Sequence, residues 1–108
     1  MDSPQFVYIL ICADGTFYTG STSDLALRLT EHQSGSDPSA YTFRRRPVRL
    51  VWCEGFPTFD QALAREHQIK GWSHEKKKAL IEGGVQAVRH VAGSVRGRRN
   101  KTRIPNPA

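Results

Sequence analysis

The sequence predicts one α+β domain, in which a small three-stranded, mainly antiparallel sheet is flanked by helices. Its 108 residues, 38% of them apolar, are enough for one modest core. Segments with strand and helix patterns follow one another in the order strand, strand, helix, strand, helix, helix, which is typical of α+β domains. No apolar run approaches the roughly 18 residues that a membrane span needs.

Three segments have the composition of strands. Residues 6–12 are aromatic, β-branched and apolar on both faces, which predicts a buried strand. The turn sequence Ala-Asp-Gly at 13–15 separates this segment from a second strand at 16–20, so the two form a hairpin. Residues 48–54 form the third strand.

The register of the hairpin decides what its two tyrosines can do. A two-residue loop would direct Tyr8 and Tyr18 to opposite faces of the sheet. A three-residue loop with Gly15 in the left-handed region would place both on one face, with Gly20 opposite Tyr8. In that register Gly20 would leave room for a ligand, whereas two ordinary strand aromatics are the structural alternative.

The first helix follows the hairpin. Residues 21–24 supply helix-start side chains, apolar residues recur at helical spacing from Leu25, and Gly35 ends the helix. A long loop, 35–47, then leads through three consecutive arginines to the third strand.

Two more helices follow the third strand. Thr58 and Gln61 form a capping box before a helix over 59–70. A shorter helix over 74–82, capped by Ser73, is expected to end at the pair of glycines that follows it.

The positive charge of the chain gathers in its last residues. Residues 1–88 carry ten basic and ten acidic side chains, whereas residues 89–108 carry six basic side chains and no acid, so the net charge of +6 belongs to this tail. We expect a domain over 1–88, a further helical turn within 85–92, and disorder beyond Gly93. Such a tail is typical of polyanion binding, most often to nucleic acid, and a solvated tail is the alternative.

Two polar residues interrupt the apolar face of a predicted helix. Glu66 falls within the apolar stripe of the helix over 59–70, where a lone carboxylate would be costly to bury. An ion pair with Lys70, four residues later, is the structural explanation. His32 lies on the apolar face of the first helix with Arg28 one turn away, and this pairing suits an anion such as phosphate.

These residues coincide with a known pattern. The sequence resembles the GIY-YIG nuclease superfamily, most closely its small standalone bacterial members. Residues 6–8 stand where the family has Gly-Ile-Tyr, and residues 18–20 where it has Tyr-Ile-Gly. The segment 24–32 matches the helix with the family's Arg and His, and 64–72 matches the segment with its metal-binding Glu. The likeness extends from about residue 6 to residue 82.

The sequence departs from the family pattern in three respects. Phe6 replaces the first Gly of the motif. Lysines occupy 76–78, where family nucleases often have an Asn. Family nucleases also commonly have a separate DNA-binding domain, whereas this chain has a basic tail.

The resemblance implies metal-dependent hydrolysis of a phosphodiester in DNA. The implied catalytic residues are Tyr8, Tyr18, Arg28, His32 and Glu66. Glu66 would hold one divalent ion, Mg²⁺ or Mn²⁺, and Arg28 would neutralise charge on the transition state. Tyr8 would act as general base, which requires its pKa to be lowered from about 10. Tyr18 and His32 would orient phosphate and water.

Nucleic acid is the expected partner. Its expected contacts are Gly20, Arg44, Arg45, Arg46, Lys70, Arg96, Arg98, Arg99, Lys101 and Arg103. A solvated loop is the alternative for the three consecutive arginines. A non-catalytic nucleic-acid-binding module is the alternative for the whole domain. Without a basic residue before the apolar run 6–13, and without a Cys-x-x-Cys pair, we expect a cytoplasmic protein without disulfide-linked or membrane partners.

Overall fold

The computed structural model describes residues 4–91. Its elements are β1 (Gln5–Ile11), β2 (Phe17–Thr22), α1 (Leu25–Ser34), the short 3-10 helix η1 (Phe43–Arg45), β3 (Arg49–Phe56), α2 (Phe59–Lys70) and α3 (His74–Val91). This order confirms the predicted α+β class.

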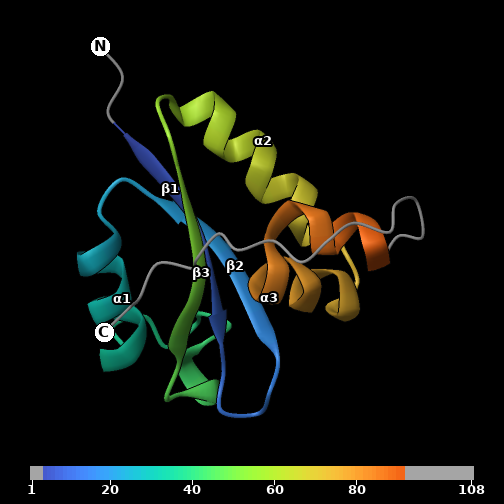
Figure 1. The fold of residues 1–108 in the computed structure, drawn as a ribbon. Coiled ribbons are helices and arrows are strands. Elements are labelled where there is room, and N and C mark those ends of the chain that lie inside the picture. The colour runs from blue at the N-terminus through green and yellow to red at the C-terminus, as the bar shows by residue number, and fades with distance from the viewer. Residues whose placement is uncertain (1–3, 92–108) are drawn as a thin grey trace.

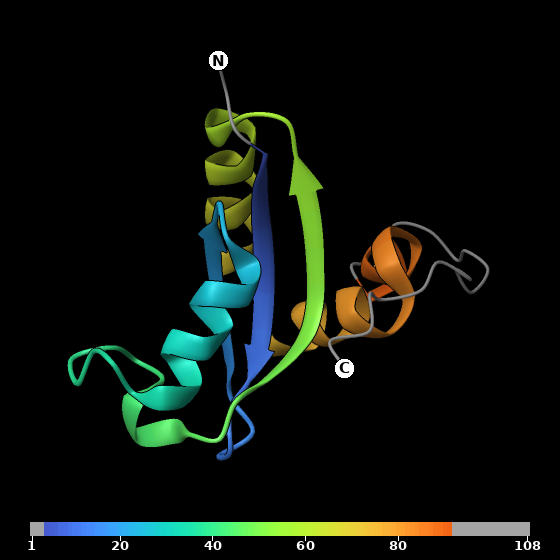
Figure 2. The ribbon, with the colours of Figure 1, turned by 90° about the vertical axis from the view of Figure 1, so that its left-hand side faces the viewer.

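The sheet has the strand order β2-β1-β3, and both pairs are antiparallel. Helix α1 covers one face, and α2 and α3 lie on the other (Figures 1 and 2). Because successive strand residues point to opposite faces, β1 contributes Val7 and Ile9 to the core under α2 and α3, and Tyr8 and Leu10 to the core under α1. The central strand is therefore buried on both faces, as its composition predicts.

The hairpin has the three-residue loop. Tyr8 pairs with Gly20 and Leu10 pairs with Tyr18, and Gly15 has a φ of 85°. A left-handed residue at this position is readily supplied by glycine. Both tyrosines therefore belong to the face covered by α1.

The predicted ends of α1 and α2 are confirmed. The Asp24 side chain accepts a hydrogen bond from the backbone N–H of Leu27 (3.0 Å), and Gly35 ends α1 with a φ of 73°. Thr58 accepts from the N–H of Gln61 (3.2 Å) at the start of α2.

Two predicted boundaries are wrong. Helix α3 continues through the glycines at 83–84 to Val91. Each glycine costs about 1 kcal/mol relative to alanine in a helix, but glycine can adopt helical torsion angles. The helix therefore continues into the residues that follow. Ser21 was expected at a helix start but lies in β2, because β2 extends to Thr22. The expected disorder beyond Gly93 falls outside the described residues. Among residues 4–91, no helix is long and apolar enough to cross a membrane.

Candidate active site

Tyr8 lies at the centre of the sheet with its phenol over Gly20. The side chain is fully buried. A Cβ atom added to Gly20 would lie 2.6 Å from Tyr8 Oη and 2.8 Å from Tyr8 Cζ, which is closer than real contacts allow. The space above Gly20, expected to admit a ligand, is therefore filled by the phenol of Tyr8.

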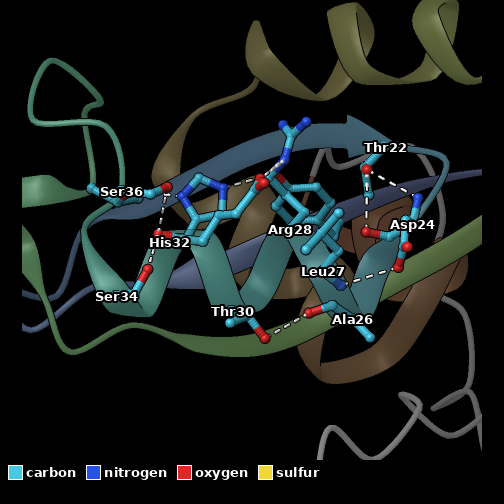
Figure 3. A network of polar contacts seen from close by, with 12 residues as sticks. Thr22, Asp24, Ala26, Leu27, Arg28, Thr30, His32, Ser34 and Ser36 are labelled. Atoms are coloured by element: carbon cyan, nitrogen blue, oxygen red, sulfur yellow. Dashed lines mark hydrogen bonds and ion pairs between the residues drawn. The ribbon is translucent and has the colours of Figure 1, made fainter.

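A chain of hydrogen bonds links Tyr8 to helix α1 and to the loop after it. The Tyr8 hydroxyl and His32 Nε2 are 2.9 Å apart, and His32 Nδ1 and Thr42 Oγ1 are 2.8 Å apart. All three residues are buried. Figure 3 shows the His32 ring on α1, directed away from the helix axis towards the strands. Both ring nitrogens are thus satisfied while the imidazole is neutral, which fixes the ring in one orientation.

Burial shifts the pKa values of this pair in opposite directions. Burial is the main cause that raises the pKa of the Tyr8 phenol well above 10; the nearby Tyr18 and Glu66 add to this rise, and Arg28 opposes it. Burial, together with the charge of Arg28, lowers the pKa of His32, and Glu31 opposes that shift. The mechanism implied by the family resemblance requires a lowered pKa for Tyr8, whereas the surroundings of Tyr8 raise that pKa. The surroundings of His32 keep it neutral at pH 7.

Arg28 borders a cavity beside this chain. Its Nε donates to Glu31 Oε1 at 3.0 Å, and both side chains are 42% exposed. Within residues 4–91, its outer N–H groups pair with no other carboxylate, so they can contact another anion. The cavity has a volume of about 300 Å³ and is lined by Tyr18, Arg28, Glu31, His32, Gly35, Ser36, Asp37, Ala40, Thr42 and Phe43.

The ring of Tyr18 contacts the Tyr8–His32 pair and also the loop that follows α1. Its ring lies 6.3 Å from the ring of Tyr8 and meets His32 edge-on at 5.2 Å, measured between centroids. On the loop side it stacks with Tyr41 at 6.0 Å. The structure therefore brings Tyr18, Arg28 and His32 together around one cavity, and the buried Tyr8 phenol contacts His32.

Glu66 lies on the other face of the sheet. It is 8% exposed, and its Oε1 accepts from the Ser21 hydroxyl at 2.7 Å while its Oε2 pairs with Lys70 Nζ at 2.8 Å. Burial acts to raise the pKa of Glu66, but hydrogen bonds from Lys70 and Ser21 outweigh it and hold that pKa below its usual value. The ion pair offered as the structural explanation is thus present.

The two halves of the predicted site meet at strand β2. Gly20 lies under the Tyr8 phenol, and the next residue, Ser21, holds Glu66 on the opposite face. The charges of Arg28 and Glu66 both act on the Tyr8 phenol, so the halves are electrostatically coupled.

Glu66 could hold a metal ion in one way only. Within the described residues, no three side chains of His, Cys, Asp or Glu are grouped so as to bind a metal. A single carboxylate fits Mg²⁺, which usually keeps several waters and takes one or two protein carboxylates together with substrate phosphate. Each Glu66 oxygen already has one partner, but each keeps a second lone pair, so a metal ion would bind there in the presence of the Lys70 charge.

Two of the three consecutive arginines have structural contacts. Arg45 lies 3.8 Å over the ring of Tyr41 and pairs with Asp14 at 3.1 Å, both at the surface. Arg46 donates to the carbonyl of Phe43 at 2.8 Å. Arg44 is exposed. The predicted contacts at 96, 98, 99, 101 and 103 lie outside the described residues.

Sequence reasoning missed three residues of the site. Thr42 and Ser21 are polar loop or strand residues whose partners lie ten and 45 positions away, and no local spacing indicates them. Glu31 could have been found, because it stands three residues after Arg28 on one helix.

The fold is that of one family. The family model described as the GIY-YIG catalytic domain matches residues 4–79, and the chain belongs to this family. The chain is similar to the UPF0213 protein of Haloquadratum walsbyi, with 45% identity over 79% of this chain and 94% of that protein. The UPF0213 protein of Desulfotalea psychrophila is 43% identical over 85% of this chain and 86% of its own. A solution NMR structure of a protein from E. faecalis covers 93% of this chain and 100% of its own, with 30% identity and a TM-score of 0.52.

Proposed function

We propose that this protein is a divalent-metal-dependent nuclease that hydrolyses phosphodiester bonds, with DNA as its substrate. One observation carries the proposal. A family catalytic domain here has a phenol hydrogen-bonded to a neutral histidine, beside a cavity that a guanidinium borders. A domain that only bound nucleic acid would have no need for a buried proton-transfer pair next to a cationic pocket.

The proton from the attacking water travels through Tyr8 in this proposal. Because burial raises the pKa of Tyr8, a free phenolate is not the base. Instead, once water reaches the phenol, which is fully buried in the free protein, the phenol passes its proton to His32 Nε2, 2.9 Å away, as its oxygen takes the proton of the water. The mechanism requires the tautomer in which Nδ1–H donates to Thr42, 2.8 Å away, so that Nε2 can receive that proton.

Arg28 supplies the permanent positive charge. A guanidinium can present two parallel N–H groups to a phosphate, and Arg28 uses only its Nε for Glu31. It would neutralise charge as it develops on the phosphoryl oxygens. Tyr18, between the tyrosine–histidine pair and the loop, would help to orient the phosphate.

Glu66, on helix α2, would hold the metal ion. A bound Mg²⁺ or Mn²⁺ would supply charge that stabilises the phosphate and the leaving oxygen. Lys70 and the exposed Arg44 would contact the nucleic-acid backbone, together with the basic tail. Structure-specific or repair cleavage in the cytoplasm suits a small basic chain of this kind.

Hydrolysis is tested with structured and single-stranded DNA in Mg²⁺ or Mn²⁺. Glu66→Gln and Arg28→Lys should each lower the rate by about 100-fold or more, because they remove a metal ligand and a bidentate phosphate contact. Glu82→Gln is the matched control, since Glu82 is an exposed carboxylate on α3. Equal cleavage by the wild type, Glu66→Gln and Arg28→Lys would indicate a contaminant and contradict the proposal.

A non-catalytic nucleic-acid-binding module is the second candidate. It is favoured by the pairing of both Glu66 oxygens within the protein. It predicts DNA binding that weakens steeply with salt, is unaffected by metal, and is not followed by cleavage.

A further inference from the structure

Each oxygen of the Glu66 carboxylate has a partner within the protein. Ser21 donates to Oε1 at 2.7 Å, and the Lys70 ammonium contacts Oε2 at 2.8 Å. An ammonium at this distance occupies the position that a cation bound to Oε2 would need. Any divalent ion at Glu66 must therefore compete with Lys70.

The two partners of this ion pair differ in their freedom to move. The side chain of Glu66 is 11% exposed and is anchored to β2 by Ser21, whereas the side chain of Lys70 is 50% exposed at the end of α2. A lysine side chain with half its surface in water is readily hydrated when it leaves, but the buried carboxylate then needs another cation in its place. When the pair separates, the Glu66 carboxylate therefore keeps its position and the Lys70 ammonium moves.

A second ammonium lies next to Lys70. Burial lowers the pKa of the half-buried Lys77 on α3, and the neighbouring charge of Lys70 lowers it further. The Glu66 carboxylate is thus paired with one lysine whose charge interacts with that of another. If a divalent ion replaced Lys70 at the carboxylate, the uncompensated positive charge would grow, and an anion would be needed to offset it.

We propose that Lys70 is a placeholder for the metal ion, and that its release couples metal binding to binding of a nucleic-acid phosphate. Lys70 leaves Glu66 when a divalent cation binds there, and the freed ammonium, together with Lys77, contacts a phosphate oxygen. Metal and phosphate therefore bind more tightly together than apart, and the coupling is reciprocal. This inference rests on the proposed function, and it assigns Lys70 two successive partners, the Glu66 carboxylate and a substrate phosphate.

Mn²⁺ binding tests the coupling without relying on catalysis. Calorimetric or electron paramagnetic resonance titrations would measure Mn²⁺ affinity with and without a hydrolysis-resistant phosphorothioate oligonucleotide. The wild type should bind Mn²⁺ about tenfold more tightly when the oligonucleotide is present. Lys70→Met should bind Mn²⁺ about tenfold more tightly than the wild type in its absence, and should gain little from its addition.

Lys78→Met is the matched control, because it removes the same charge from an exposed position on α3. It should change Mn²⁺ affinity by less than about twofold, whereas Glu66→Gln should abolish binding at this site. Thermal melting would establish that each variant is folded.

The inference is overturned if Lys70→Met binds Mn²⁺ no more tightly than Lys78→Met does. It is also overturned if the oligonucleotide leaves the Mn²⁺ affinity of the wild type unchanged, or if neither protein binds Mn²⁺. These outcomes are distinguishable from failure of the nuclease proposal, because cleavage and its loss in Arg28→Lys are measured separately.

Discussion

The two faces of the sheet hold their polar residues by different means. Under α1, Tyr8, His32 and Thr42 are buried and joined by hydrogen bonds between neutral groups. Under α2, Glu66 is held by an ion pair with a half-exposed lysine. Neutral buried networks fix geometry, whereas a pair with one mobile member can exchange partners. The first face is thus prepared for proton transfer, and the second for taking up a cation.

Gly20→Ala should have the largest effect on stability, because the added Cβ would lie 2.6 Å from Tyr8 Oη. Displacing a buried ring by overpacking costs roughly 1–3 kcal/mol. Thermal denaturation should therefore show a clearly lower melting temperature, and cleavage should be lost. Gly55→Ala is the control, since its nearest contact would be an ordinary 3.5 Å; similar destabilisation by both would show that Tyr8 does not need the glycine.

Thr42→Val should destabilise the α1 face next most. The substitution keeps the shape of the side chain but leaves His32 Nδ1 buried without its partner, which costs about 1–3 kcal/mol. Chemical denaturation measures this. Thr30→Val, at an exposed threonine of α1, should change the free energy of unfolding much less. An equal effect of the two substitutions would contradict the role of the buried hydrogen bond.

The pH dependence of stability should come from His32 in the range below about pH 6.5. Burial lowers its pKa in the folded state, so the unfolded chain binds more protons there. Stability is therefore fully present above the unfolded pKa of about 6.5 and falls as the pH drops towards the folded pKa. Between pH 8 and pH 5, the melting temperature of the wild type should fall more steeply than that of His32→Gln. An equal fall in the melting temperatures of the two proteins would mean that burial does not lower the pKa of His32 in the folded state.

Glu31→Gln should have the smallest effect. The Arg28–Glu31 pair is 42% exposed on both sides, and such pairs contribute less than about 1 kcal/mol. The melting temperature should barely change, while the affinity for a single-stranded oligonucleotide, measured by fluorescence anisotropy, should rise slightly because Arg28 is released. A large loss of stability would show that this pair belongs with the buried network instead.

The strands, the caps of α1 and α2 and the family motifs could be predicted because they depend on local patterns. Asp24 and Gly35 mark the ends of α1 by their own backbone preferences. The hairpin register could not be decided, since two- and three-residue loops fit the same sequence and only the torsion angle of Gly15 distinguishes them. The predicted end of α3 was wrong because two glycines lower helix stability without ending the helix.

The site was predictable in its residues but not in its arrangement. Polar side chains on apolar stripes indicated Arg28, His32 and Glu66. Their separation onto two faces depends on which helix covers which side of the sheet, and on the contacts of Ser21 and Thr42 with distant parts of the chain. Neither is a property of local sequence.

The most direct test is the single-turnover rate of DNA cleavage by Tyr8→Phe, which removes the hydroxyl from the pair with His32 and keeps the ring over Gly20. The rate should fall by about 100- to 10,000-fold, as for loss of a general base, while Tyr41→Phe, at an exposed ring, should stay near the wild type. A Tyr8→Phe rate within about twofold of the wild type would contradict a proton path through Tyr8 and His32.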